Sequence, residues 1–171
     1  MLDLVVAIDP GTRESGVCLV SAEDYRPLWC AKVENSILLG ETLTAIYDTF
    51  PVPSESIHLV IERMHNPMSA DSNVFLTCEW IGRFDVMFQT VLKGKTEYVF
   101  RHEEYKCLCA NMYPRNDKGI RQALVERFAY GQPNFGKGTK ANKGWFYGFS
   151  ADCWQSYAIA CTYLDRAKER T

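Results

Sequence analysis

An apolar run near the amino terminus, Leu4-Val5-Val6-Ala7-Ile8, constrains the fold more than any other part of the sequence. It is rich in β-branched residues and has no polar alternation, which predicts a strand buried on both faces of a sheet. Asp9 follows directly, and Pro10 and Gly11 favour a turn. The rigid end of a buried strand can aim a carboxylate into a cleft. A purely turn-forming Asp explains the same residues, because Asp-Pro-Gly suits turns by itself.

A second strand ends in the same way. The apolar run at residues 57–61 is followed by Glu62. Further strands are predicted at 17–20, 28–33 and 97–100, and helices at about 37–50, 73–92, 102–112, 117–130 and 150–170. This order predicts an α/β fold with a mixed five-stranded sheet and helices on both faces. A chain of 171 residues suffices for a single domain, 1–171.

The overall composition is that of a globular protein in water, with 47% hydrophobic and 23% charged residues. No apolar run reaches the roughly 20 residues that a membrane span needs. The first residues, Met1-Leu2-Asp3, lack the basic segment and apolar core of a secretion signal. We therefore expect a cytoplasmic protein that does not contact a membrane.

The seven cysteines are odd in number and scattered, and none has Cys-x-x-Cys spacing. Cys107 and Cys109 form the closest pair, but no histidine stands nearby at ligand spacing. The pattern therefore argues against a zinc site or a disulfide framework and favours free thiols.

Positive charge is concentrated in one part of the chain. Residues 93–143 hold 11 Lys and Arg against 5 Asp and Glu, while the remainder holds 8 against 16. The segment 131–148 combines glycines and aromatic residues with Lys137, Lys140 and Lys143. Such a loop can approach phosphates and stack on bases, so it is a candidate nucleic-acid contact. Solvated charge on helices and an ordinary flexible loop explain the same pattern without a ligand.

Three acidic residues stand at positions that the fold can bring together. Asp9 and Glu62 end strands, and Asp152 lies near the start of the final helix, which can pack over those ends. Carboxylates gathered in this way repel one another unless cations lie between them, and hard oxygen ligands favour Mg²⁺ or Mn²⁺. Two such ions roughly 4 Å apart can promote phosphodiester hydrolysis. The three acids are therefore candidate catalytic and metal-binding residues.

The segments Ala7-Ile8-Asp9-Pro10-Gly11-Thr12 and Leu59-Val60-Ile61-Glu62 resemble the RuvC family of Holliday junction resolvases, which are RNase H-like nucleases. The resemblance spans most of the chain. It implies an RNase H-like fold and a crossover junction endodeoxyribonuclease that acts in DNA recombination and repair. It also implies a homodimer that cuts four-way DNA junctions symmetrically, with the helix 73–92 and its Gly82-Arg83 at the interface. A bacterial or phage source fits the resemblance.

The resemblance also assigns basic residues. Asn116-Asp117-Lys118 is similar to the lysine-bearing segment of the family, which implies that Lys118 contacts the phosphate or the transition state. Lys106 lies near the family's other lysine, with the spacing shifted by one residue. The expected nucleic-acid-binding residues are Lys106, Lys118, Arg121, Lys137, Lys140 and Lys143.

The final helix departs from the family pattern. Asp152-Cys153-Trp154-Gln155 resembles the family's Asp-x-x-Asp segment, but Gln155 replaces the second acid. The two side chains share one helix face at i and i+3. A glutamine still offers a carbonyl oxygen as a metal ligand, but it removes a negative charge, so the second ion should bind more weakly.

Two alternatives stay open at this point. Beside a junction-cutting nuclease, they are an RNA-processing nuclease of the related YqgF group and a junction-binding protein whose cleavage is impaired by Gln155. An actin-like kinase is disfavoured, because that class needs two such domains and a second phosphate loop. Walker-type nucleotide binding fails, since Val17 stands where the motif requires lysine.

Overall fold

The structure is a computed structural model of the chain, and it describes residues 4–49, 52–64 and 71–170. Its five strands are β1 (Leu4–Asp9), β2 (Glu14–Ser21), β3 (Pro27–Glu34), β4 (Ile57–Arg63) and β5 (Thr96–Phe100). They form one sheet in the order β3-β2-β1-β4-β5. The first three strands are antiparallel neighbours, whereas β4 pairs in parallel with both β1 and β5. The predicted mixed five-stranded sheet is confirmed.

Within the described residues, five α-helices and three short helical turns accompany this sheet. The helices are α1 (Leu38–Thr49), α2 (Ser72–Leu92), α3 (Arg101–Glu104), α4 (Asp117–Ala129) and α5 (Ala151–Glu169), and the turns are η1 (Ser54–Ser56), η2 (Tyr105–Cys109) and η3 (Asn134–Gly136). The helix predicted at 102–112 begins at Arg101, changes into the π-helical η2 and ends at Cys109. Residues 65–70, between β4 and α2, lie outside the described residues.

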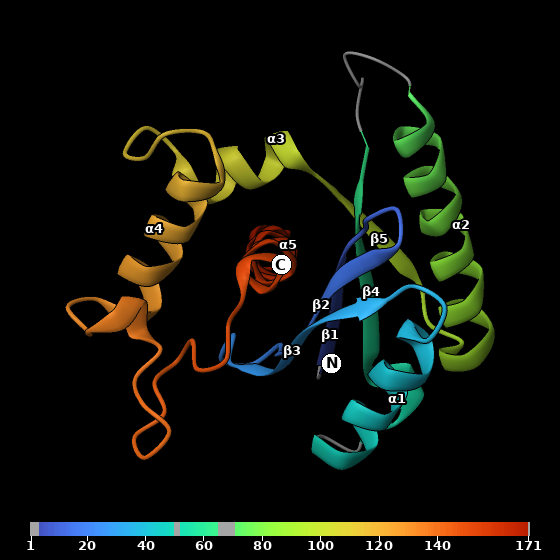
Figure 1. Cartoon of the computed structure of the whole chain (residues 1–171), viewed down its shortest axis with the longest axis horizontal. Helices are drawn as coiled ribbons and strands as arrows, with labels where there is room; N and C mark the ends of the chain where they lie inside the picture. Colours follow the sequence, from blue (N-terminus) through green and yellow to red (C-terminus); the bar gives the residue numbers. More distant parts are fainter. Residues whose placement is uncertain (1–3, 50–51, 65–70, 171) are drawn as a thin grey trace.

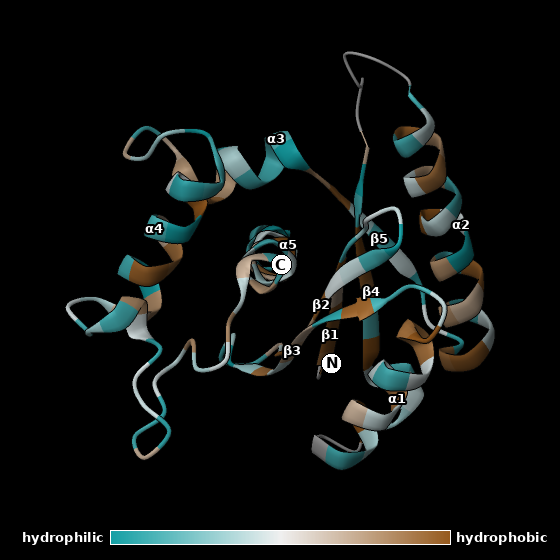
Figure 2. Cartoon of the chain, viewed as in Figure 1, coloured by the Kyte–Doolittle hydropathy of each residue, from teal (hydrophilic) through white to brown (hydrophobic). Residues whose placement is uncertain are grey.

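Helices cover both faces of the sheet. In Figure 1, α5 is seen end-on between the sheet and α4, while α1 and α2 lie on the opposite side. Two buried clusters correspond to this arrangement, one beneath α5 and α4 and one beneath α1 and α2. The central strands are among the most hydrophobic parts of the chain (Figure 2), as expected for strands that face a core on each side.

The alternation of side chains along the strands decides which face each acid occupies. Val5 and Ala7 belong to the core beneath α5, and so does Val60. Since side chains two positions apart point to the same face of a strand, Asp9 and Glu62 continue these rows toward α5. Ile8 lies opposite Ile61 in the parallel pair, so the two acids follow one residue further along adjacent strands.

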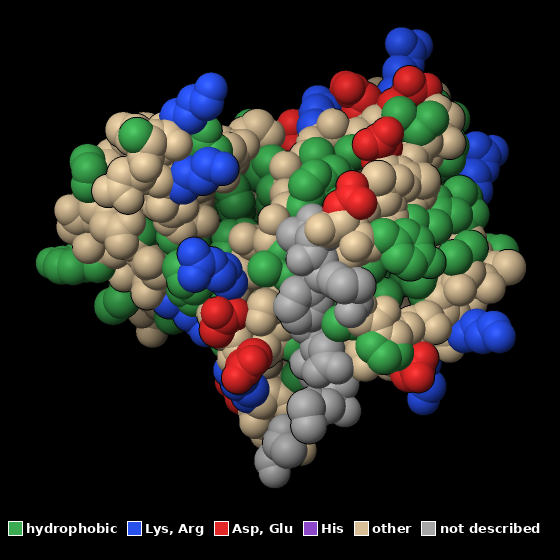
Figure 3. Space-filling view, turned by 90° about the horizontal axis from the view of Figure 1, so that it is seen from below, with side chains coloured by type: hydrophobic (Ala, Val, Ile, Leu, Met, Phe, Trp, Pro, Cys, Tyr) green, Lys and Arg blue, Asp and Glu red, His purple; other side chains and the backbone are tan. Residues whose placement is uncertain are grey.

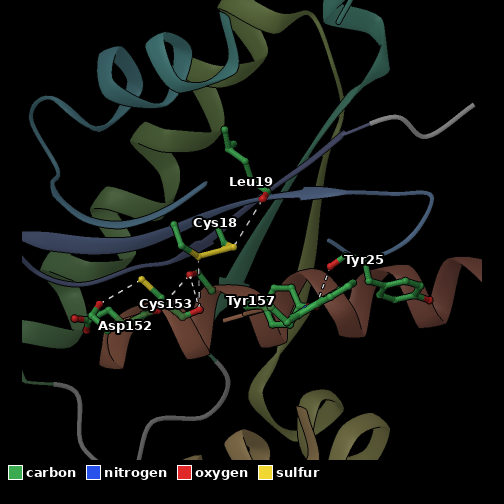
Figure 4. The surroundings of a disulfide bond; sticks show 10 residues. Cys18, Leu19, Tyr25, Asp152, Cys153 and Tyr157 are labelled. Atoms are coloured by element: carbon green, nitrogen blue, oxygen red, sulfur yellow. Dashed lines mark hydrogen bonds between the residues drawn. A yellow bond between two sulfur atoms is a disulfide. The ribbon is translucent and has the colours of Figure 1, made fainter. Parts of the chain in front are cut away.

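The cysteine prediction needs a correction, because Cys18 and Cys30 are joined in a disulfide bond. They lie directly opposite each other in the β2–β3 pair, with their Cα atoms 4.3 Å apart. Figure 4 shows this bond beside the first turn of α5, where Cys30 Sγ lies 3.9 Å from the Cys153 carbonyl oxygen. Spacing in the sequence could not reveal this pair, because strand register brings the residues together. The other five cysteines are free thiols, as predicted.

No helix within the described ranges is both long and apolar enough to cross a membrane.

Candidate active site

Asp9 and Glu62 form the centre of the candidate site. The two carboxyl groups lie close enough that each one shifts the pKa of the other. Burial and repulsion by Glu62 raise the pKa of Asp9 well above its ordinary value of 3.8. Burial raises the pKa of Glu62 from 4.5 to about 7, and repulsion by the Glu104 carboxylate adds to this rise. Two buried acids that repel each other cannot both ionise readily without a cation, so Asp9 and Glu62 are a candidate cation site.

Gly16 brings Asp152 to these two acids. It pairs with Asp9 across β1 and β2, and a Cβ atom built on it would lie only 2.7 Å from the Asp152 carbonyl oxygen. The first turn of α5 therefore rests against the strand backbone at a place where only glycine leaves room. The Asp152 carboxylate contributes to the raised pKa of Asp9 and lies 3.6 Å from the Lys32 ammonium group. Asp9 therefore interacts electrostatically with both Glu62 and Asp152.

Arg101 is a cation already present among these acids. It begins α3 directly after β5, whose parallel pairing with β4 brings it to the edge of the sheet where Glu62 lies. Its Nε atom lies 3.0 Å from Glu62 Oε1, and its guanidinium also donates a hydrogen bond to Gln155 Oε1. Burial alone would lower the pKa of Arg101, but the surrounding carboxylates outweigh this effect and raise it.

Glu104 adds a further acid beneath the site. Its side chain is 0% exposed, and its Oε2 atom lies 3.2 Å from the guanidinium of Arg101. Its other oxygen, Oε1, has no hydrogen-bond partner within the described part of the chain. Burial raises the pKa of Glu104 to about 8. The Arg101 guanidinium partly offsets the effect of burial, and the nearby Asp9 and Asp117 carboxylates add to the rise.

The oxygens present suit a divalent cation in their chemistry. Asp9, Glu62 and Asp152 offer carboxylate oxygens, and Gln155 offers a carbonyl oxygen, all of which are hard ligands that Mg²⁺ and Mn²⁺ accept. Among residues 4–49, 52–64 and 71–170, however, no three His, Cys, Asp or Glu side chains form an arrangement that could hold a metal ion. The predicted ligands are therefore present, but their side chains do not form a metal-binding arrangement in the described residues.

Two clefts meet at Asp9 and Asp152. One has a volume of about 390 Å³ and is bordered by the turn at residues 10–14 and by Lys32. The other has a volume of about 430 Å³, and its lining includes Lys118, Arg121 and Gln155. The second cleft reaches Asp9 and Asp152 from the side of α4.

The start of α4 places Lys118 in this cleft. The Asn116 side chain caps the helix by accepting a hydrogen bond from the Gly119 amide at 2.9 Å. The Arg121 guanidinium lies 3.9 Å from the centre of the Phe135 ring and 5.0 Å from that of Trp154. These rings hold Arg121 at the wall of the cleft.

The remaining predicted DNA contacts are distributed more widely. Lys137 donates a hydrogen bond to the Phe149 carbonyl at 2.6 Å, which gives it a structural role in the loop. Lys140 is exposed, and the ammonium of Lys143 lies 4.9 Å from the centre of the Tyr147 ring. Lys106 lines a separate cleft with residues of the carboxyl-terminal half of α5. It therefore lies apart from the cleft that holds Lys118 and Arg121.

Sequence reasoning missed Arg101, Glu104 and Lys32 as members of the site. A usable signal was present for Arg101, because it follows a predicted strand in the same way that Glu62 does. Glu104 lies one helical turn further along, on the same side as Arg101. Lys32 had no such signal, since it lies within a strand and reaches Asp152 only through the pairing of β3 with β2.

Comparisons with known proteins identify the fold. No protein-family model and no curated protein matches the chain. Among solved structures, RuvC from Thermus thermophilus in complex with a Holliday junction substrate superposes with a TM-score of 0.68 and 13% identity, over 98% of this chain and 96% of that one. A second Thermus thermophilus RuvC structure also has a TM-score of 0.68 and 13% identity, over 98% and 97%.

A third similar structure comes from a eukaryote. The yeast mitochondrial Holliday junction resolvase Ydc2 superposes with a TM-score of 0.54 and 13% identity, over 95% of this chain and 79% of that one. Identities this low carry information on the fold alone. The strand order, the helices on both faces and these superpositions together show that the chain has the RNase H-like fold of the RuvC-type resolvases.

Proposed function

We propose that this chain is a metal-dependent endonuclease that resolves four-way DNA junctions by symmetric phosphodiester hydrolysis. The observation that supports this most is the pair of linked carboxyl groups, Asp9 and Glu62, at the ends of two parallel strands, with Asp152 above them at the border of two clefts. The structural neighbours named RuvC and Ydc2 are junction resolvases, which adds support from the fold.

The acidic residues form the catalytic centre in this proposal. Asp9, Glu62 and Asp152 would hold the cations, together with the carbonyl oxygen of Gln155. When bound, one or two Mg²⁺ or Mn²⁺ ions supply an activated water and neutralise charge on the phosphate that is cut. The burial of Asp9 and Glu62 strengthens their electrostatic interaction with a bound cation, because water screens charge less inside a protein.

Lys118 and Arg121 act on the phosphate backbone. Both line the 430 Å³ cleft beside Asp9 and Asp152. Lys118 contacts the phosphate that is cut, and the stacked Arg121 guanidinium binds a neighbouring phosphate. Lys140 and Lys143 extend the contact along the loop that follows α4. Figure 3 shows Lys and Arg side chains on the part of the surface where α4 and this loop lie. Lys106 binds DNA further from the acids.

The active form in this proposal is a homodimer through α2. Phe75 and Val86 are 59% and 65% exposed, and they lie on one helix face together with Gly82. Within the described residues, a Cβ atom on Gly82 would meet nothing within 4 Å, so no neighbouring group covers the middle of this helix face. Hydrophobic side chains are also visible in Figure 3 on the side of the molecule where α1 and α2 lie. Two active sites, one from each copy, account for symmetric cutting.

A second candidate function is junction binding without efficient cleavage. Gln155 replaces an acid, and Arg101 already donates a hydrogen bond to its carbonyl oxygen. Asp152 is paired with Lys32 at 3.6 Å. Both contacts lower the charge available for a cation, and they are the observations that support this second candidate.

The deciding experiment compares three substrates in Mg²⁺ and in Mn²⁺: a four-way DNA junction, duplex DNA and a structured RNA. The proposal predicts paired, symmetric cuts in the junction and little cutting of the duplex. Tight junction binding without cuts at any metal concentration would establish the second candidate. Preferential cutting of the RNA would instead place the chain with RNA-processing nucleases.

A further inference from the structure

Arg101 occupies the oxygens that a metal ion would need. Its guanidinium contacts Glu62 Oε1 at 3.0 Å and also bonds to the Gln155 carbonyl oxygen. Both residues belong to the proposed ligand set. A divalent cation and this guanidinium cannot use the same oxygens at full strength, because each withdraws electron density and restricts the geometry of the ligand. Any cation that binds here therefore competes with Arg101.

Glu104 offers Arg101 another position. It lies three residues further along on the same helix, its side chain is fully buried, and one of its oxygens already contacts Arg101 at 3.2 Å. Its second oxygen has no hydrogen-bond partner in the described ranges. A buried carboxylate oxygen without a partner is costly, so a second donor would stabilise it. A guanidinium can supply two parallel donors to one carboxylate, and Arg101 is the nearest such group.

We propose that Arg101 is a built-in counter-cation that moves from Glu62 and Gln155 onto both oxygens of Glu104 when a divalent cation binds. Glu104 is then a positioning residue that holds Arg101 away from the ligands. This inference rests on the metal site of the proposed function. It gives the buried Glu104 a role at the site. The final helix carries Gln155 in place of a second acid, and Glu104 contributes its charge by holding Arg101.

Asp117 does not fill the same role. Its Oδ1 atom lies 3.9 Å from the guanidinium, and its side chain is 70% exposed. Water therefore competes with Arg101 for Asp117 and weakens that pairing. The buried Glu104 pair is shielded from this competition, so it is the stronger alternative partner.

The test measures Mn²⁺ binding to the metal-free, full-length protein by calorimetry, without DNA. Arg101→Met should bind Mn²⁺ at least about fivefold more tightly than the wild type, which is the lower end of typical coupling between linked equilibria. Arg101→Lys should also bind more tightly, because one ammonium keeps the charge but cannot bridge three side chains. Glu104→Gln should bind Mn²⁺ more weakly, since Arg101 then has no alternative partner.

The double variant separates positioning from direct ligation. In the Arg101→Met background, Glu104→Gln should weaken Mn²⁺ binding less than it does when Arg101 is present. The matched controls are Arg166→Met and Glu103→Gln, which remove the neighbouring 3.0 Å pair outside the site and should leave Mn²⁺ affinity at the wild-type level. Thermal unfolding of each variant verifies that it folds. If Arg101→Met does not fold, the Mn²⁺ affinity of Arg101→Lys decides the test.

Four results would overturn the inference: unchanged affinity in Arg101→Lys, weaker binding in Arg101→Met, an equal effect of Glu104→Gln with and without Arg101, or no Mn²⁺ binding by any variant. The proposed function is judged separately by junction cleavage. Wild-type protein that cuts junctions while the Arg101 variants bind Mn²⁺ like wild type would refute this inference alone. The predicted binding pattern without any cleavage would refute the nuclease alone.

Discussion

Asp9 is the residue whose loss should affect the chemistry most directly. Asp9→Asn keeps the size of the side chain but removes the charge that a cation needs. We expect junction cleavage to fall by about 100-fold or more, the loss typical of removing a group that stabilises charge in a transition state. Junction binding should change little, because the predicted phosphate contacts come from other residues. Cleavage rates and gel-shift affinities measure the two effects, and cleavage that persists would remove Asp9 from the mechanism.

The carboxyl group of Glu62 should make stability depend on pH in the metal-free protein. Its pKa rises from 4.5 to about 7 on folding, so between these values the folded state binds more protons than the unfolded state. Stability is then highest below about pH 4.5 and declines as the pH rises toward 7. The rise in pKa corresponds to roughly 3 kcal/mol at most. Denaturant unfolding at several pH values measures this slope.

Glu62→Gln provides the control for that pH dependence. A glutamine does not titrate, so the decline in stability between about pH 4.5 and 7 should become shallower in this variant. An identical slope in both proteins would show that the Glu62 carboxyl group does not control stability in this range.

Saturating Mn²⁺ should also raise the unfolding temperature of the wild type more at pH 8 than at pH 5, because protons compete less with the ion at the higher pH.

Gln155 is the residue at which a substitution should change the Mg²⁺ concentration that cleavage requires. Gln155→Asp restores a carboxylate one helical turn from Asp152, and this added charge should attract a divalent cation. We expect cleavage to reach half of its maximum at several-fold lower Mg²⁺ concentration. A Mg²⁺ titration of cleavage by wild type and variant measures the shift. An unchanged titration would show that residue 155 does not contact the metals.

The contact between β2 and α5 is the decisive one at the scale of elements. Gly16→Ala places a Cβ atom 2.7 Å from the Asp152 carbonyl oxygen, so the first turn of α5 must move away from the sheet. We expect a loss of about 1–3 kcal/mol in stability, as for other overpacked sites. Cleavage should fall further than this loss explains, because Asp152 moves away from Asp9. Unfolding and cleavage are both measured at a temperature where the variant is folded.

Gly40→Ala is the matched control for this change. Gly40 lies in α1, is exposed, and has nothing within 4 Å of an added Cβ atom. Alanine favours helices over glycine by about 1 kcal/mol, so this variant should be equally stable or more stable. Its cleavage should equal that of the wild type. A Gly16→Ala protein that cuts as well as Gly40→Ala would show that the packing of α5 does not position Asp152.

The assembly of two copies belongs to the scale of the whole molecule. Val86→Glu introduces a charge into the exposed apolar face of α2 and should shift the protein from dimer to monomer, because a buried unpaired charge is costly. Light scattering after size-exclusion chromatography measures the mass. Met112→Glu is the control, since Met112 is 78% exposed outside α2 and its change should leave the dimer intact. Equal masses for both variants would contradict an α2 interface.

Much of the fold was readable from local patterns. The runs ending at Asp9 and Glu62 predicted β1 and β4 because buried strands have a distinctive composition, and the periodic apolar segments predicted the long helices. The Cys18–Cys30 bond was not readable, because it depends on the register of β2 against β3. The position of Arg101 at the end of a predicted strand was readable, but its partners were not, since they come from β4, α3 and α5.

The sequence by itself determined which acids this protein has and that Asp9 and Glu62 end buried strands, because local composition controls strand formation and termination. The tertiary structure alone decided what those acids meet. Packing against Gly16 places Asp152, and the parallel pairing of β4 with β5 brings Arg101 to Glu62. The physical reason is that electrostatic interactions depend on distance in space and on burial, and neither quantity can be read from separation along the chain.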